Sequence, residues 1–139
     1  MTSPVEETLV LIKPDGVVRS LTGEILRRIE AKGYSLVDIK IVQADRELLA
    51  RHYEEHQGKP FYEPLVEFME SGPIVAIRIA GNRVIEGFRS LAGTTDPTSA
   101  APGTIRGDLA RDWGLPVQQN LVHGSDSPES AARELALWF

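Results

Sequence analysis

The chain has 139 residues, 42% of them hydrophobic and 25% charged, which is the composition of one ordinary globular domain spanning residues 1–139. It has no cysteine, which excludes disulfides and thiolate metal sites, and no apolar run approaches the roughly 20 residues of a membrane-spanning helix. The net charge of −5 argues against binding nucleic acid over a broad basic face, but a small nucleotide needs only a few local cations. Residues 1–7 are polar and acidic, unlike a secretion signal, so a cytoplasmic protein is expected.

The first part of the chain predicts a strand, a helix and a second strand. The apolar run at residues 8–12 indicates a buried strand. It should end at Lys13-Pro14-Asp15-Gly16, because proline cannot donate to a ladder and Asp-Gly favours a turn. Apolar residues at helical spacing between 21 and 29 predict a helix that Gly33 terminates, and residues 34–42 predict the next strand.

The middle of the chain predicts helices before and after a third strand. Asp45 can cap a helix that ends before Gly58, and residues 61–70 have the pattern of another short helix. Residues 74–80 alternate and are β-branched, which is typical of a strand. Residues 82–91 then carry apolar side chains on one side of a helix.

The last part of the chain completes a small sheet covered by helices. Residues 94–108 are rich in Gly, Pro and Thr and predict an ordered loop, and residues 117–122 predict a fourth strand. Ser127-Pro128 is a cap followed by proline at the first position of a final helix, which runs to Trp138. The order of elements predicts the split β-α-β plan of an α+β protein. A parallel doubly wound sheet is the alternative.

The common nucleotide-binding signatures are missing from this sequence. There is no G-x-x-x-x-G-K-[ST] loop, no G-x-G-x-x-G and no H-R-D or D-F-G kinase motif. If the protein transfers phosphoryl groups, another arrangement of residues must do so.

Two of the three histidines, His52 and His56, stand four apart on a predicted helix. A zinc protease helix requires glutamate directly after the first histidine, where this chain has Tyr53. We therefore interpret the pair as two solvated helix histidines.

The third histidine, His123, lies at the end of a predicted strand and is followed by Gly124-Ser125-Asp126 and a helix. A side chain at a strand end beside a helix N-terminus lies where anions are bound, although a lone histidine there is more often structural. Three basic residues, Lys13, Arg89 and Arg106, adjoin turns or glycines in a similar way. Each alone reads as a surface charge, but arginine forks near one histidine would fit phosphate oxygens.

Several motifs together resemble those of the nucleoside diphosphate kinases. They cover nearly the whole chain, in the family's order, and include the active-site signature around His123. The motifs are Leu11-Ile12-Lys13-Pro14-Asp15-Gly16, Ser71-Gly72-Pro73, Pro102-Gly103-Thr104-Ile105-Arg106-Gly107-Asp108, Asn120-Leu121-Val122-His123-Gly124-Ser125-Asp126-Ser127 and Leu137-Trp138-Phe139.

This resemblance implies a ferredoxin-like fold, with a four-stranded, mainly antiparallel sheet covered by helices, and a ping-pong reaction. A magnesium–nucleoside triphosphate would phosphorylate His123, and a nucleoside diphosphate would then collect the phosphoryl group. Glu134 would orient or polarise the imidazole. The residues implied to hold phosphates and ribose are Lys13, Tyr53, Arg89, Thr95, Arg106 and Asn120, the last at the sugar. Phe61 and Leu65 would lie against the base.

The chemistry expected of such a site is consistent with these residue types. A histidine nucleophile must be neutral, and an ordinary imidazole pKa of about 6.5 leaves it mostly so at pH 7. Phosphoryl transfer needs mainly alignment and charge stabilisation, which Lys13, Arg89, Arg106 and Mg²⁺ would supply, with the metal held mainly by nucleotide phosphates rather than by protein groups. A base held by stacking is not read by hydrogen bonds, so broad base specificity is expected.

The sequence departs from the family pattern in two places. Residues 109–119 form a stretch a few residues longer than usual, and it carries Trp113, so it is either a solvated loop or a turn that packs on a neighbouring subunit. The chain also ends at Phe139, without the C-terminal extension of some relatives. A homo-oligomer is expected, and the choice between a dimer-based tetramer and a hexamer stays open.

Two other functions compete with this interpretation. A silent relative would keep the fold without activity, but such proteins usually lose part of the residue set that is intact here. An RNA-binding ferredoxin-like domain would need aromatic side chains on its central strands, and residues 8–12 and 74–80 contain none.

Overall fold

The computed structural model describes residues 5–139, and all its strands belong to a single sheet. Residues 1–4 of the acidic N-terminal segment lie outside the described part. The elements in chain order are β1 (Glu6–Ile12), α1 (Pro14–Val18), α2 (Thr22–Ala31), β2 (Ser35–Val42), α3 (Arg46–His52), the 3-10 turn η1 (Glu54–His56), α4 (Tyr62–Glu70), β3 (Ile74–Gly81), α5 (Val84–Ala92), α6 (Ile105–Leu109), β4 (Val122–Gly124) and α7 (Pro128–Trp138).

The sheet has the strand order β2-β3-β1-β4, and each neighbouring pair is antiparallel. The central strands β1 and β3 pair with Val10 opposite Ile77, and β4 pairs with β1 so that Leu11 lies opposite His123. The α+β, ferredoxin-like prediction is therefore confirmed, and the parallel doubly wound alternative is wrong.

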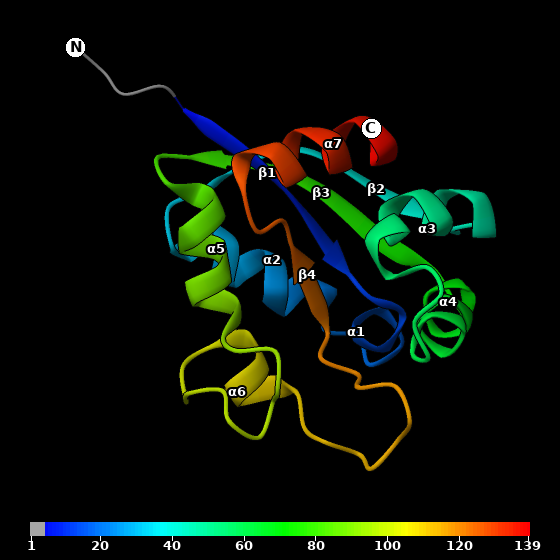
Figure 1. Cartoon of the computed structure of the whole chain (residues 1–139). Helices are drawn as coiled ribbons and strands as arrows, with labels where there is room; N and C mark the ends of the chain where they lie inside the picture. The colour runs from blue at the N-terminus through cyan, green and yellow to red at the C-terminus, as the bar shows by residue number, and fades with distance from the viewer. Residues whose placement is uncertain (1–4) are drawn as a thin grey trace.

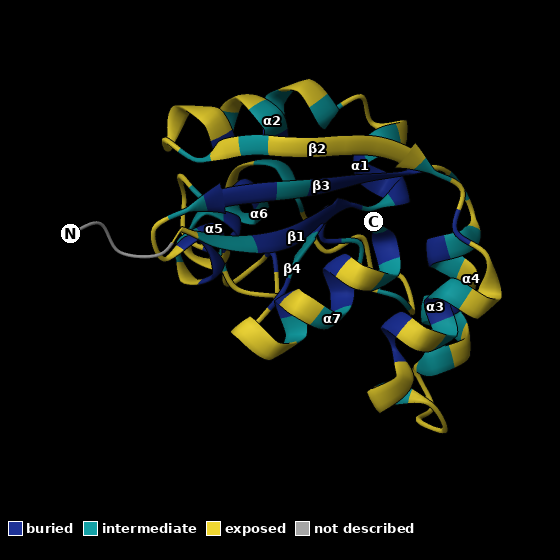
Figure 2. Cartoon of the chain, turned by 90° about the horizontal axis from the view of Figure 1, so that it is seen from above, coloured by how far each residue is buried: buried dark blue, intermediate teal, exposed yellow. Residues whose placement is uncertain are grey.

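Helices cover both faces of this sheet (Figures 1 and 2). The side chains of β1 alternate between two apolar clusters, because successive residues of a strand point to opposite faces. Val10 and Ile12 pack with residues of α2 and α5, whereas Leu9 and Leu11 pack with residues of α3, α4 and α7. Burial on both faces explains why β1 reads as a continuous apolar run. Among the described residues, no helix is long and apolar enough to cross a membrane.

Three of the predicted helix-capping residues, Asp45, Ser127 and Gly93, agree with the structure. The Asp45 side chain accepts a hydrogen bond from the Leu48 N–H at 2.8 Å, and Ser127 Oγ accepts one from the Ser130 N–H at 3.1 Å. Both are N-caps that satisfy an otherwise unpaired donor. Gly93 follows α5 with a φ of +88°, a conformation that glycine adopts without strain.

Three predicted boundaries are corrected by the structure. The loop at residues 94–108 contains the start of α6, and Pro14 begins the short helix α1 rather than a turn. The fourth strand is only Val122–Gly124, not residues 117–122. The physical reason is that Leu121 has a φ of +74°, a left-handed conformation that breaks the pleat and lets pairing begin only at Val122.

Candidate functional site

A pocket of about 640 Å³ lies where the chain leaves β1, at the edge of β4, with α3 and α5 contributing to its walls. It gathers residues that are far apart in sequence. Of the predicted site residues, those that line it are Lys13, Tyr53, Leu65, Arg89, Thr95, Arg106, Asn120, His123 and Glu134. Phe61 alone does not.

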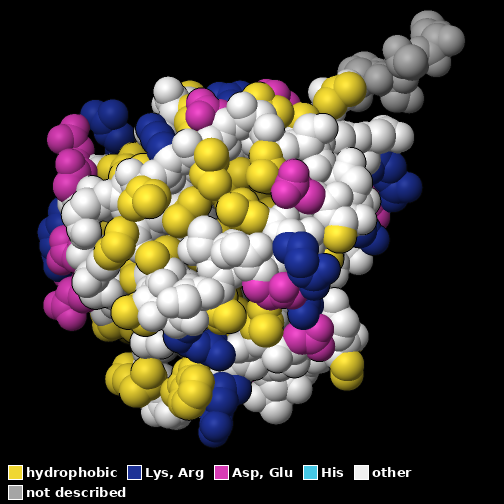
Figure 3. Space-filling view, turned by 180° about the vertical axis from the view of Figure 1, so that it is seen from behind, with side chains coloured by type: hydrophobic (Ala, Val, Ile, Leu, Met, Phe, Trp, Pro, Cys, Tyr) yellow, Lys and Arg dark blue, Asp and Glu magenta, His cyan; other side chains and the backbone are white. Residues whose placement is uncertain are grey.

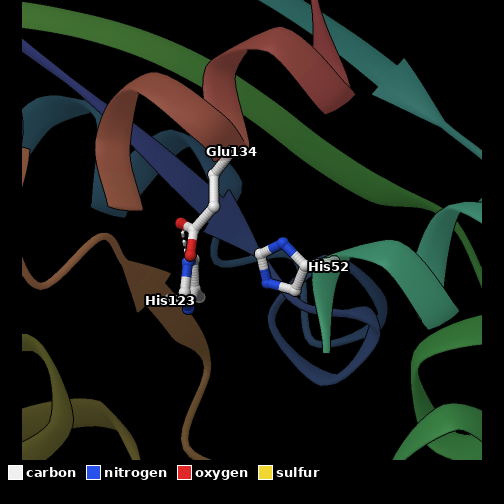
Figure 4. A group of neighbouring side chains, drawn as sticks. All are labelled: His52, His123 and Glu134. Atoms are coloured by element: carbon white, nitrogen blue, oxygen red, sulfur yellow. Dashed lines mark hydrogen bonds and ion pairs between the residues drawn. The ribbon is translucent and has the colours of Figure 1, made fainter. Parts of the chain in front are cut away.

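His123 is held in place by a carboxylate on the last helix. It is the middle residue of β4, and its Nε2 lies 2.7 Å from Oε1 of Glu134 on α7 (Figure 4). The Ser125 hydroxyl donates to the same oxygen, also at 2.7 Å. Glu134 is buried, with a side chain 8% exposed, whereas that of His123 is 21% exposed and lines the pocket.

The Glu134 carboxylate is ionised in this arrangement. Burial by itself would raise its pKa, but the hydrogen bond and charge of His123 and the bond from Ser125 outweigh burial and lower the pKa to about 2. An ionised carboxylate only accepts hydrogen bonds, so the proton between the two groups belongs to His123 Nε2. The lone pair of a neutral His123 is therefore on Nδ1.

Lys13 is fixed by the amide of Asn120. Its Nζ donates to Asn120 Oδ1 at 2.9 Å, while Asn120 Nδ2 donates to the backbone oxygen of Thr95 at 3.0 Å. Burial and the neighbouring Arg106 lower the pKa of Lys13 to about 8. Asn120, expected at the sugar, thus uses both ends of its amide to join β1 to the loop after α5.

The backbone before His123 is anchored by buried Asp15. Leu121 keeps its left-handed conformation because its N–H donates to Asp15 Oδ2 at 3.1 Å and its carbonyl accepts from the Lys13 N–H at 2.8 Å. A non-glycine residue in this region costs on the order of 1–3 kcal/mol and needs such support. The two bonds tie the active-site strand to the start of α1.

The two predicted arginine clamps differ sharply in their surroundings. Arg106 is partly buried and donates to three backbone oxygens, those of Asn120 at 3.2 Å, Gly93 at 2.9 Å and Val122 at 2.6 Å. Burial and the nearby Arg89 lower the pKa of Arg106 to about 10. Arg89 is exposed and makes one long contact, 3.4 Å, to the oxygen of Gly124. Only Arg106 is built into the fold.

Aromatic side chains form the wall opposite β4. Tyr53 is buried, and burial raises the pKa of its hydroxyl, which therefore remains a donor. The ring of His56 lies 6.1 Å from that of Tyr53 and 5.2 Å from that of Phe61. Phe61, 48% exposed, thus reaches the pocket rim only through His56, and its contact with a base stays a prediction.

The interpretation of His52 as a solvated histidine is wrong. It is 4% exposed, its ring lies 4.7 Å from that of His123, and its Nδ1 accepts from the Trp138 indole N–H at 3.0 Å. The missed signal is helical spacing, because His52 is three residues after buried Leu49 and lies on the same face of α3. The roles of Ser125 and Asp15 were missed as well. Their hydrogen-bond partners, Glu134 and Leu121, lie on other segments, and no local sequence pattern predicts these contacts.

Glu134, His52 and His123 also offer three ligand atoms within 4.8 Å of one another. Such a set has the donor types of a zinc site. However, the indole N–H can only donate, so His52 Nδ1 must accept and its proton must be on Nε2. His52 therefore has no free lone pair to offer a metal.

Comparison with known proteins identifies the family. Residues 6–139 match the family model described as nucleoside diphosphate kinase. The chain belongs to the nucleoside diphosphate kinase family. The resemblance seen in the motifs is thereby confirmed.

Individual members of the nucleoside diphosphate kinase family match almost end to end. The chain is 61% identical over 135 residues to the enzyme of that name from Mycobacterium sp. (strain MCS) and 58% identical over 135 residues to that from Streptomyces avermitilis, covering 96% of both sequences each time. Its fold matches a halophilic nucleoside diphosphate kinase from Halobacterium salinarum in complex with CDP, with a TM-score of 0.91, 46% identity, and coverage of 98% of this chain and 88% of that one. The fold also matches a nucleoside diphosphate kinase family protein from Babesia bovis, with a TM-score of 0.90 and 44% identity, covering 96% of this chain and 88% of that one.

Proposed function

We propose that this chain is a nucleoside diphosphate kinase that moves the γ-phosphoryl group of a nucleoside triphosphate, typically ATP, to a nucleoside diphosphate through a phosphohistidine at His123. One observation carries the proposal. The contact of His123 Nε2 with Glu134 Oε1, 2.7 Å long, leaves Nδ1 as the nucleophilic nitrogen in a pocket that Lys13 and Arg106 also line.

The reaction consists of two displacements at phosphorus. In the first, the Nδ1 lone pair of His123 forms a bond to the γ-phosphorus while the bond to the bridging oxygen breaks and the diphosphate leaves. In the second, a terminal oxygen of an acceptor diphosphate attacks the same phosphorus and Nδ1 regains its lone pair. The ring becomes more positive while it carries the phosphoryl group, and the ionised Glu134 carboxylate stabilises that charge through Nε2–H.

The cations of the pocket supply the charge stabilisation that phosphoryl transfer needs. Lys13 is directed by Asn120, and the N–H groups of Arg106 that do not bind backbone oxygens remain for phosphate. Arg89, Tyr53 and the loop at Thr95 complete the ring around the phosphates. We expect Mg²⁺ to arrive with the nucleotide, because the best-placed carboxylate, Glu134, already accepts from His123 and Ser125.

The base would lie at the outer end of the pocket, against Leu65 and Phe61. Leu65 lines the pocket and Phe61 is exposed next to its rim. Both side chains are apolar and neither can distinguish the hydrogen-bonding edges of bases, so purine and pyrimidine nucleotides should both be substrates. A preference of several orders of magnitude in kcat/KM for one base would contradict this part.

A homo-oligomer is part of the proposal, together with the expected cytoplasmic location. Within residues 5–139, β2 pairs only with β3, so its outer edge is open. On this strand Val37, Ile39 and Ile41 are 50%, 44% and 75% exposed, and Figure 3 shows apolar side chains gathered across the face opposite to that of Figure 1. An open apolar edge is a surface that a second copy would cover. The mass in solution tests this.

The longer segment at residues 109–119 is either a solvated loop or a turn that packs on a neighbouring subunit. Trp113 and Leu115 are 48% and 50% exposed, and the guanidinium groups of Arg111 and Arg19 lie over the Trp113 ring at 4.4 Å and 5.9 Å. If deletion of this segment leaves the mass in solution unchanged, the segment is a solvated loop.

The decisive test is incubation with γ-labelled ATP. The native chain should acquire a label that is labile in acid and stable in alkali, and a nucleoside diphosphate should remove it. His123→Ala should acquire none. A native chain that takes no label would favour a silent relative, and label unaffected by His123→Ala would refute the assignment of the nucleophile.

A further inference from the structure

A second histidine lies beside the reacting one and has no role in the mechanism above. The rings of His52 and His123 meet edge to face, with centroids 4.7 Å apart and planes at 74° (Figure 4). His52 comes from α3 and His123 from β4, so the two elements bring together rings that are 71 positions apart in sequence. A buried polar ring next to a nucleophile calls for an account of where its proton is.

Trp138 fixes that proton. The indole Nε1–H donates to His52 Nδ1 at 3.0 Å, and Trp138 is only 2% exposed, so the bond is shielded from water. Because an indole nitrogen has no lone pair to accept with, the tautomer with hydrogen on Nδ1 would set two donors against each other. The proton of neutral His52 is therefore on Nε2.

His52 also stays neutral across the working pH range. Burial lowers its pKa to about 3, and the adjacent His123 acts in the same direction. Its Nε2–H is thus a constant hydrogen-bond donor rather than an acid or a base. The charged neighbours of the ring are Glu134 and Arg133 on α7 and Lys13 at the end of β1.

This donor faces the pocket. The two nitrogens of an imidazole point in nearly opposite directions, so Nε2 is directed away from Trp138 and the core, and His52 lines the pocket. Among residues 5–139, the buried side-chain polar atoms without a partner are Thr8 Oγ1, Asp15 Oδ1 and His56 Nδ1. His52 Nε2 is not one of them and makes no hydrogen bond within the described chain, so it remains open to solvent.

A phosphoryl group would meet this N–H. One nitrogen of each histidine and an oxygen of Glu134 lie within 4.8 Å of one another. A separation near 4.8 Å is too long for a hydrogen bond between the two rings. A phosphoryl oxygen on His123 Nδ1 would lie two bonds beyond that nitrogen, and the ring centroids of His52 and His123 are 4.7 Å apart, so the oxygen would come close to His52.

We propose that His52 is a catalytic residue whose Nε2–H donates to a phosphoryl oxygen as the group moves to and from His123, and that Trp138 is the positioning residue that keeps the proton on Nε2. The inference rests on the proposed function. It assigns to His52 the work of an oxyanion donor, which is preorganised because its tautomer is set before substrate arrives. It also uses the His52 lone pair that a metal at the nearby trio of ligand types would need.

The test is the single-turnover rate of phosphohistidine formation from γ-labelled ATP. His52→Phe keeps a ring of similar size without the donor and should slow the step by about 10–100-fold, somewhat less than the loss of a sole oxyanion donor. The apparent affinity for nucleotide should change much less than the rate. His52→Gln, which keeps a neutral N–H, should recover most of the loss. Arg51→Gln, an exposed change on the same helix, serves as the matched control and should leave the rate unchanged.

Trp138→Phe tests the tautomer separately. It removes the indole donor and keeps an aromatic ring, so His52 can place its proton on either nitrogen and the rate should fall less than in His52→Phe. In the double variant the Trp138 change should add no further loss, because its effect passes through His52. The double variant, His52→Phe with Trp138→Phe, also removes the unpaired indole N–H that His52→Phe alone would leave. If His52→Phe fails to fold, the rate of the double variant tests whether the His52 donor speeds the reaction.

The labelling experiments distinguish a failure of the proposed function from a failure of the role of His52. If the native chain takes no label, the proposed function fails. If the native chain is labelled normally and folded His52→Phe or Trp138→Phe reacts at the native rate, the function stands and the role of His52 is refuted. Inhibition by low Zn²⁺ concentrations that His52→Phe abolishes would show a free lone pair on His52 and would overturn the tautomer assignment.

Discussion

Replacing Arg106 and Arg89 separately by alanine should distinguish binding of phosphate, which the sequence predicts for both, from stabilisation of the fold, which the structure indicates for Arg106. Arg106 donates to three backbone oxygens, two of them flanking Leu121 on the approach to His123, whereas Arg89 has one contact at 3.4 Å. Both changes remove a cation from the pocket. Only the first also removes bonds that hold β4 to the end of α5.

The expected magnitude for Arg106→Ala follows from opposing terms. Each hydrogen bond from a charged donor contributes about 1.5–3 kcal/mol, and the three bonds are not fully additive. Against them, burial and the nearby Arg89 lower the pKa of Arg106 to about 10, so holding this charge in place costs on the order of 3 kcal/mol. The bonds should win, with a net loss of about 1–5 kcal/mol on removal, or roughly 3–15 °C in Tm for a domain of this size. Arg89→Ala should change stability by less than about 0.5 kcal/mol.

The assay pairs thermal and denaturant unfolding without nucleotide with the rate of phosphoryl transfer. Both variants should lose about 10²–10³ in turnover, by analogy with the loss of one charge-stabilising donor. Arg106→Lys should keep the positive charge but satisfy fewer carbonyls, so it should unfold at an intermediate temperature. If Arg106→Ala unfolds at the native temperature, or if Arg89→Ala loses as much stability, the structural role of Arg106 is refuted.

Three further predictions follow from the same site. Because the pKa of Lys13 is about 8, kcat/KM for a nucleoside diphosphate should fall as the pH rises through 8, and Lys13→Arg should remove this decline from the pH profile. Ser125→Ala should slow phosphohistidine formation by about 3–10-fold in single-turnover labelling, since one of the two donors to Glu134 remains; no change would mean that Ser125 does not help to hold the carboxylate. Gly124→Ala would place a Cβ 2.7 Å from the buried ring of Phe88, and the overpacking should lower stability by about 1–3 kcal/mol in denaturant unfolding, with native stability as the contrary result.

Local patterns predicted the elements of this fold well where one physical signal dominated. The continuous apolar run of β1 reflects burial on both faces of the sheet, and the caps at Asp45 and Ser127 reflect unpaired N–H groups at helix starts. The predicted fourth strand began too early because Leu121 does not continue it: its left-handed backbone depends on a bond to Asp15, more than a hundred positions away. No window along the chain contains that information.

The same division holds within the site. The motifs alone indicated which side chains gather around His123, since sequence similarity to a family transfers residue identities. They did not reveal that His52 is buried, that Arg106 is committed to three carbonyls, or that Asn120 holds Lys13. These are contacts between elements, and they assign the donors and lone pairs on which the chemistry depends.

By itself, the sequence determined the class of fold, most helix and strand positions, the family and the candidate nucleophile, because these follow from periodicity, turn chemistry and motif identity. Only the tertiary structure decided which nitrogen of His123 and which nitrogen of His52 carries a proton. That is set by Glu134 at His123 and by Trp138 at His52, through hydrogen bonds of 2.7 Å and 3.0 Å between side chains on different elements. A hydrogen bond requires its atoms to meet at about this distance, and folding alone brings them there.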